Sequence, residues 1–283
     1  MPLNCRTDLA SEARELLSDD IGEVRGIRAR EETVHGHRVV AVEVLTDEGA
    51  ELIGKPIGRY FTLFLDGRFE RGAEQFETSA RAVAELICRC MRGERAASCL
   101  IAALGNPDIT PDALGSLAAG SILVTRHLKR AAVDGFDAFM STALCRTGVL
   151  GTTGVESAAQ IRSLVHETQP ELVIAIDALA GSELGGLCRT VQICDSGIAP
   201  GSGVGNNREE LSRAGLGVPV IAVGVPTVVD AAALAPGEEL RGMFVTPRDI
   251  DALVRAAGRL IGYGVDLALH PGLTVADIDM LVG

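Results

Sequence analysis

The 283-residue chain contains no tryptophan, and aromatic residues make up only 3% of it. Because 47% of the residues are hydrophobic, the core must be built mainly from Ala, Val, Leu and Ile, and 33 glycines indicate many tight turns. No run of about 18 or more apolar residues occurs, so no transmembrane helix is expected. The N-terminus is charged from Arg6 onward and lacks the apolar centre of a signal peptide, which predicts a cytoplasmic protein.

Paired cysteines are also missing. The cysteines are odd in number and form no C-x-x-C pair; they stand at positions 5, 88, 90, 99, 145, 188 and 194. This pattern indicates small core residues in a reducing compartment rather than disulfides or a thiolate zinc site. The net charge of −12, from 26 basic and 38 acidic residues, argues against a nucleic acid as direct partner.

The signatures of serine, zinc and P-loop chemistry are absent as well. Neither G-x-S-x-G nor H-E-x-x-H occurs, and the five histidines are scattered. The stretch GAELIGKP (49–56) has P-loop spacing, but Pro56 stands where a magnesium-binding hydroxyl is required. The HGH run at 35–37 is more typical of a surface turn than of a metal site. We therefore expect no cofactor and no metal.

The pattern of apolar residues predicts an α/β fold with an N-terminal β-rich region. Residues 22 to 65 include strand-like runs at 38–45 and 59–65, followed by a helix over 72–93. Beyond that helix, buried strands alternate with helices, which is typical of a mostly parallel sheet flanked by helices on both faces. The predicted strands of this part are 98–104, 121–125, 172–176, 190–194 and 219–225, and a long helix follows VTPRDID. We expect a β-rich region at 9–70 and an α/β core at 71–283, forming one continuous domain.

Two helices in the core carry start signals. Thr110 followed by Pro111 predicts an N-cap and a first helical residue. Thr153 and Glu156 have the spacing of a capping box, and Pro170 lies just beyond the predicted end of that helix.

Two aspartates are expected at the same edge of the sheet. Asp177 directly follows the apolar strand 172–176, and Asp112 lies in the loop-to-helix turn after strand 98–104. The carboxyl ends of parallel strands meet at one edge, where sites form in open α/β sheets. A helix start favours ionised Asp112, whereas desolvation would raise the pKa of Asp177. Two carboxyls with different pKa values can serve as base and acid in hydrolysis.

The same residues also fit purely structural roles. On this alternative interpretation, Asp112 does no more than start a helix, and Asp177 does no more than accept hydrogen bonds from neighbouring backbone amides. Asp108, in the same loop as Asp112, is an alternative that spacing does not exclude.

A glycine-rich loop, CDSGIAPGSGVGNNREEL (194–211), is the third candidate feature. Gly201, Gly203 and Gly205 resemble a phosphate cradle, but their spacing is not the dinucleotide fingerprint. The loop amides could instead contact a substrate backbone or a transition state, or the loop could be a structural turn.

Several longer motifs resemble the spore germination protease family, in order and over nearly the whole chain. They are RTDLASEA (6–13), GKPIGRYFTL (54–63), LGNPDITPDALG (104–115), GTTGVES (151–157), LVIAIDALA (172–180), ICDSGIAPGSGVGN (193–206), GVPVIAVGVPTVVDA (217–231) and GVDLALHP (264–271). The resemblance implies a core similar to hydrogenase maturation peptidases and a homotetramer. It also implies an atypical aspartic endopeptidase of the spore cytoplasm that degrades small acid-soluble, DNA-coating proteins during germination.

The resemblance also implies roles for particular residues. By motif match the catalytic aspartates are Asp112 and Asp177, and the active-site loops contain Asn106, Thr153 and the three loop glycines Gly201, Gly203 and Gly205. Family members are made as zymogens cut near the RTDLA motif. Here the cut would fall between Asp8 and Leu9, so that residues 1–8 form a short propeptide.

The chain departs from the family pattern in two places, and two alternatives to an aspartic peptidase stay open. Ser116 stands where the family usually has Pro, and AGSELGG (180–186) replaces bulkier residues after Asp177. In the related maturation peptidases, carboxylates at these positions help to recognise nickel, so a metal-binding peptidase is one alternative. A catalytically inactive binding protein on the same scaffold is the other.

Overall fold

The computed structural model describes residues 8–15, 23–24, 26–65, 75–93, 96–201, 208–234, 240 and 242–282. The strands are β1 (Glu23–Val24), β2 (Ile27–Val34), β3 (His37–Val44), β4 (Gly58–Phe64), β5 (Ser98–Ala103), β6 (Ser141–Arg146), β7 (Leu172–Gly181), β8 (Thr190–Cys194), β9 (Val220–Asp230) and β10 (Phe244–Val245). The helices are α1 (Ala10–Glu15), α2 (Asp47–Ile53), α3 (Phe76–Cys90), α4 (Leu114–Ala118), α5 (Arg126–Arg130), α6 (Leu150–Thr153), α7 (Ser157–Thr168), α8 (Arg213–Leu216), α9 (Ala231–Leu234), α10 (Ile250–Leu269) and α11 (Val275–Val282). Two 3₁₀ turns, η1 (Thr110–Asp112) and η2 (Ala119–Ser121), lie on either side of α4.

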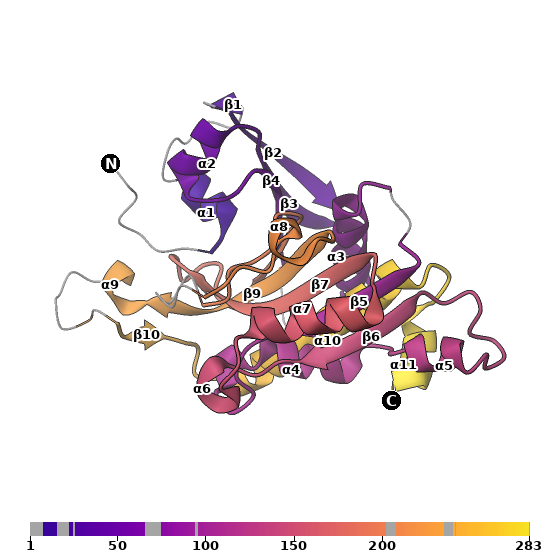
Figure 1. Ribbon diagram of the computed structural model, residues 1–283. Helices are drawn as coiled ribbons and strands as arrows, with labels where there is room; N and C mark the ends of the chain where they lie inside the picture. The colour runs from indigo at the N-terminus through magenta and orange to yellow at the C-terminus, as the bar shows by residue number, and fades with distance from the viewer. Residues whose placement is uncertain are drawn as a thin grey trace.

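All of these strands belong to one mixed sheet in the order β1-β2-β3-β4-β8-β9-β7-β5-β6, with β10 paired to β9 (Figure 1). Strands β9, β7, β5 and β6 are parallel to one another, whereas β8 and the N-terminal strands pair antiparallel. The N-terminal β-rich region is joined to the core by the pairing of β4 with β8. The structure thus confirms an α/β fold with an N-terminal β-rich region, in which both parts share one sheet.

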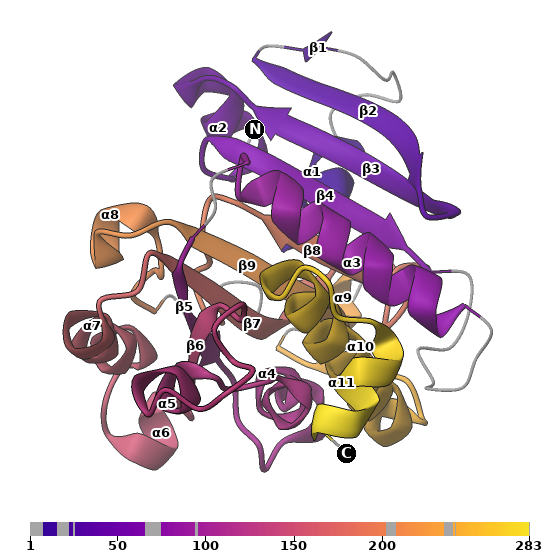
Figure 2. The same ribbon diagram turned by 90° about the vertical axis from the view of Figure 1, so that its right-hand side faces the viewer.

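Helices cover both faces of the central part of the sheet. Helices α3, α4 and α10 pack on one face, which is turned toward the viewer in Figure 2, and α7 packs on the other. Strand β7 alternates between these layers: Ile174 and Ile176 are buried with α3 and α10, while Val173 and Ala175 are buried with α7. Because side chains alternate along a strand, Asp177 belongs to the α7 side.

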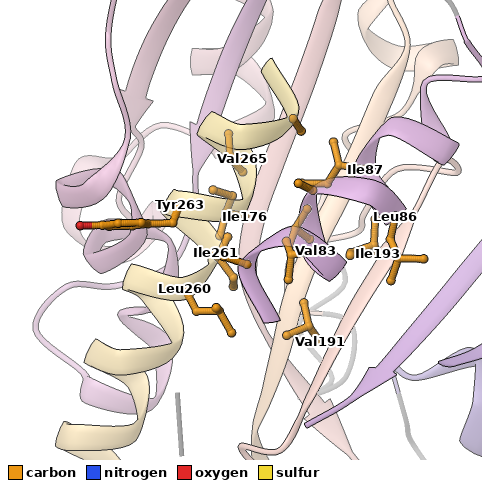
Figure 3. Close-up of a cluster of buried hydrophobic side chains, with 14 of the residues drawn as sticks. Val83, Leu86, Ile87, Ile176, Val191, Ile193, Leu260, Ile261, Tyr263 and Val265 are labelled. Atoms are coloured by element: carbon orange, nitrogen blue, oxygen red, sulfur yellow. The ribbon is translucent and has the colours of Figure 1, made fainter. Parts of the chain in front are cut away.

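The larger core is aliphatic, as the scarcity of aromatic residues requires. Figure 3 shows part of it, where Val83 and Ile87 of α3 and Ile261 of α10 lie with Ile176 of β7 and Ile193 of β8. Each fully buried side chain of this size contributes about 1.5–3 kcal/mol to folding. The core therefore holds β7, the central strand of the site described below, between its neighbours.

The predicted strand at 121–125 is wrong, and β6 was missed. After η2 the segment turns away from strand pairing, because the Leu123 N–H donates to both carboxyl oxygens of Asp266 at 3.1 Å. The edge position beside β5 is taken by β6, whose sequence STALCR is too polar to signal a buried strand. Among its described residues, the region expected to be β-rich also contains the helices α1 and α2, of which α2 is capped by the Thr46 side chain.

The two predicted helix caps are also wrong. Thr110 lies inside η1, and α4 begins only at Leu114, without a side-chain cap. Thr153 ends α6, and α7 begins after Glu156, again without a side-chain cap. Within the described residues, no helix has the length and apolar character needed to cross a membrane.

Candidate active site

Asp112 and Asp177 line one cavity of about 430 Å³, which lies just beyond β5 and along the C-terminal half of β7. Gly201 lies in the same lining, and so do Asp8 and Arg208, two residues that the sequence did not assign to the catalytic centre. The expectation that the two aspartates meet at one edge of the sheet therefore agrees with their positions in the structure.

Asp177 is embedded in β7 rather than placed at its end. The strand continues to Gly181, because β9 pairs alongside it as far as Val229, with a bulge between Leu179 and Ala180. Only 4% of Asp177 is exposed, and its Oδ1 accepts a hydrogen bond from the Ala178 N–H at 3.0 Å. Burial raises the pKa of Asp177 well above its ordinary value, and the negative charge of Asp112 raises it further.

Asp112 is held at the cavity by two close backbone approaches. Gly105 has φ +93°, and a Cβ there would lie 2.0 Å from the Asp112 carbonyl oxygen. At Gly115 a Cβ would lie 2.4 Å from the Leu104 carbonyl oxygen and 2.6 Å from that of Ile176. The LGNPDITPDALG loop thus folds back against the ends of β5 and β7 because glycine stands at both positions.

The ionisation of Asp112 differs from the expectation. Burial raises the pKa of Asp112, and the Asn106 N–H, which donates to Oδ2 at 2.9 Å, and the charge of Arg208 offset this only in part. A helix dipole contributes little, since Asp112 precedes the five-residue α4 rather than lying in its first turn. The rise is larger for Asp177, so the pair favours a state with one proton, held by Asp177.

Hydrogen bonds from threonine hydroxyls attach the η1 turn, which contains Asp112, to β9. Thr227 donates to the Pro111 carbonyl oxygen at 2.7 Å, and Thr246 donates to the Thr227 carbonyl oxygen at 2.9 Å. Thr110 donates to Asp251 of α10 at 2.7 Å. Sequence reasoning missed Thr227, because nothing local in GVPTVVD reveals which loop its hydroxyl will meet.

The remaining candidates fall in different places. Asn106 contributes its amide to Asp112, and its Oδ1 accepts a hydrogen bond from the Asp108 N–H at 3.0 Å. Asp108 itself is exposed and does not line the cavity. Thr153 is exposed, bonds to the Val149 and Val155 backbone, and also lies outside the lining. Gly203 and Gly205 lie outside the described residues.

The expected cleavage point lies beside the aspartates. The Asp8 N–H donates to the Ala180 carbonyl oxygen at 2.9 Å, and the Ala180 N–H donates to Asp8 Oδ2 at 2.8 Å. Gln192 holds the next stretch, donating to the Asp8 carbonyl oxygen at 2.7 Å and accepting from the Ala10 N–H at 2.8 Å. Leu9 is only 1% exposed. The segment around the Asp8–Leu9 bond is therefore fixed to β7 just beyond Asp177.

The potential metal ligands in the cavity are carboxylates. Carboxylates of Asp8, Asp112 and Asp177 line the cavity, but no histidine does. Over the part of the chain that the structure describes, no three His, Cys, Asp or Glu side chains are grouped closely enough to hold a metal ion.

Together, the fold and the site define an α/β protein with two neighbouring carboxyls of unequal acidity in one cleft, an arrangement suited to acid–base hydrolysis. The family model described as germination protease matches residues 5–238. The germination protease of Caldanaerobacter subterraneus subsp. tengcongensis is 38% identical, covering 99% of this chain and 98% of the relative. That of Bacillus subtilis is 42% identical, covering 81% and 64%. The chain belongs to the germination protease family and is a peptidase.

A solved structure also resembles the chain at a lower level. The NiFe hydrogenase maturation protease HycI from Thermococcus kodakarensis is 18% identical, with a TM-score of 0.36, and covers 64% of this chain and 98% of its own.

Proposed function

We propose that this peptidase cleaves small acid-soluble spore proteins during germination, with Asp112 as general base and Asp177 as general acid. The main support is that the two carboxyls share one cavity while burial raises the pKa of Asp177 more strongly than that of Asp112. A base must be ionised and an acid must carry a proton, so unequal carboxyls assign the roles.

The proton transfers of this reaction take place between these two carboxyls, water and the substrate. The Asp112 carboxylate takes a proton from a water molecule, whose oxygen bonds to the peptide carbonyl carbon. The Asp177 carboxyl gives its proton to the carbonyl oxygen as the C=O π bond opens. The C–N bond then breaks, the proton on Asp112 passes to the leaving nitrogen, and the new carboxyl group returns a proton to Asp177. Atoms and charge balance over the cycle.

The N-terminal segment supports processing of a precursor as part of this proposal. Asp8 lines the cavity and is hydrogen-bonded to Ala180, three residues beyond Asp177 in β7. Cleavage after Asp8 would remove residues 1–8 and leave the region 9–70 and the core 71–283 on their shared sheet. A homotetramer acting in the spore cytoplasm completes the proposal, on family resemblance alone.

The test is a mass-resolved digestion of a small acid-soluble spore protein in the presence of chelator. Asp112→Asn and Asp177→Asn should each lower kcat/KM at least about 100-fold, because general acid or base assistance contributes about 10²–10⁴ in rate. Asp108→Asn is the matched control, since Asp108 is exposed and outside the cavity, and it should cleave like wild type. The enzyme's own N-terminus is followed in the same spectra.

Each outcome bears on a separate part of the proposal. Full activity in both cavity variants would refute the aspartate pair. Activity of wild type that appears only when one metal ion is added back would replace it with metal-dependent hydrolysis. Cleavage of other proteins but not of the spore protein would refute the substrate and leave the chemistry standing.

A further inference from the structure

Arg208 is a half-buried cation in the wall of the cavity that contains Asp112 and Asp177. It lies between β8 and β9, so the loop that follows β8 brings it over the edge of the sheet where the aspartates meet. Among the described residues, Arg208 forms no ion pair or hydrogen bond. Other arginines are neutralised: Arg59 by Asp195 at 2.9 Å and Arg162 by Glu209.

The charge of Arg208 nevertheless acts on both aspartates. It lowers the pKa of Asp112 and that of Asp177, in each case against the larger effect of burial. Arg208 therefore lies close enough to Asp112 and Asp177 for its charge to lower the pKa of both, although it forms a direct ion pair with neither. Its guanidinium N–H groups are then available to a third oxygen in the cavity.

Peptide hydrolysis supplies such an oxygen. When water adds to the peptide carbonyl, electron density moves onto the carbonyl oxygen before its proton transfer is complete. A guanidinium has five N–H donors in a planar fork and stays protonated at any working pH, so it can hold an oxygen that is gaining charge. Donors placed for this charge act most strongly in a site that excludes water.

We propose that Arg208 is a third catalytic residue, which donates hydrogen bonds from its guanidinium to the carbonyl oxygen of the scissile peptide bond in the transition state. The proposal rests on the proposed function, since it concerns the same reaction. The bonds that form and break are those described above: Arg208 keeps its protons, and Asp177 supplies the proton that ends on the oxygen. Arg208 also keeps Asp112 ionised at lower pH than Asp112 would be alone.

The experiment compares Arg208→Gln, Arg208→Lys and Arg208→Gly with wild type on a small acid-soluble spore protein, measuring kcat and KM across pH. The matched control is Arg213→Gln, because Arg213 is an exposed arginine in the neighbouring α8 and does not line the cavity. Asp177→Asn is measured in parallel. Circular dichroism and the thermal midpoint confirm that each variant is folded.

We expect Arg208→Gln to lower kcat about 10²–10³-fold with little change in KM, as for the loss of one oxyanion donor. Arg208→Lys, which keeps the charge but loses the planar fork, should retain intermediate activity. Added guanidinium ion, far below unfolding concentrations, should partly restore Arg208→Gly and not Asp177→Asn. Without the cation the pKa of Asp112 rises, so the acidic limb of the kcat profile should move to higher pH.

Several results would overturn the proposal. An unchanged kcat in Arg208→Gln would do so, as would a loss confined to KM, which would make Arg208 a binding residue. A loss of kcat without a shift of the acidic limb and without guanidinium rescue would indicate a structural role. If Arg208→Gln does not fold, the intermediate kcat of Arg208→Lys and the guanidinium rescue of Arg208→Gly decide the matter. Failure of the aspartate pair is seen separately, as full activity of Asp177→Asn.

Discussion

Asp177→Asn should lower kcat/KM at least about 100-fold and yet stabilise the protein, by an amount that grows with pH. The wild-type carboxyl is 4% exposed, and burial raises its pKa well above the ordinary value of 3.8. The folded state therefore binds the Asp177 proton more tightly than the unfolded state does. The stabilisation from that proton is complete below the ordinary pKa and is lost as pH rises through the folded-state pKa.

The magnitude follows from the same linkage. Over the pH window between the unfolded and folded pKa values, wild type loses about 1.4 kcal/mol of unfolding free energy per pH unit relative to a variant that does not titrate there. The substituted asparagine amide keeps an oxygen for the Ala178 N–H, so the hydrogen bond that the wild-type carboxyl accepts can be retained. The variant should therefore become progressively more stable than wild type from about pH 4 upward.

The assay is urea unfolding of both proteins at equal concentration, in steps of pH from 4 to about 8, where only the difference in unfolding free energy is interpreted. Asp112→Asn should show the same trend more weakly, because the pKa of Asp112 is raised less. Asp108→Asn, at an exposed position, serves as the control and should show none. If the unfolding free energies of wild type and Asp177→Asn changed in parallel with pH, Asp177 would not be desolvated in solution, and the assignment of Asp177 as the acid would be refuted.

Three further predictions concern residues around the site and one distant histidine. Gly105→Ala should lower stability by about 1–2 kcal/mol, because its backbone is left-handed, and should also lower kcat/KM, because the added Cβ would displace Asp112. The control is Gly93→Ala, which has φ +77° but open space around the added Cβ and should therefore lower only stability. Thr227→Val should lower the free energy of unfolding by about 1 kcal/mol, because it removes the hydrogen bond to the Pro111 carbonyl oxygen, and should reduce kcat/KM because η1 is held less firmly. An unchanged rate in peptide assays would show that this hydrogen bond does not position Asp112. Burial and Lys129 lower the pKa of His270 to about 4, so stability should fall as pH drops from about 6.5 to about 4, by up to about 3 kcal/mol, and His270→Gln should flatten that slope in urea titrations.

Much of the site could be predicted from the sequence, because its signals are local. The apolar run 172–176 predicts a buried strand, and the loop after 98–104 carries a second carboxylate, so short stretches of sequence suffice to single out both aspartates. In a parallel arrangement their strands end at one edge, and β5 and β7 are indeed parallel neighbours. The helical spacing of apolar residues likewise predicts α3 and α10, since that periodicity needs no knowledge of the partner.

What the sequence left open are the contacts between distant segments. Strand β7 runs past Asp177 because β9 pairs beside it, and the four residues from Ala178 to Gly181 are too few to predict that pairing from the sequence. The pKa of Asp112 is raised, against expectation, because burial by the surrounding loops outweighs what a short turn can supply. Arg208 and Asp8 join the same cavity from segments that lie far apart in the chain.

By itself, therefore, the sequence determined the α/β class, the aliphatic core and the two aspartates, because apolar periodicity and short motifs act over a few neighbouring residues. Only the tertiary structure decided which carboxyl keeps its proton, which cation lies beside the pair and which backbone edge receives the Asp8 segment. Those properties depend on desolvation and on charges brought together through space, and neither is encoded in any single stretch of the chain.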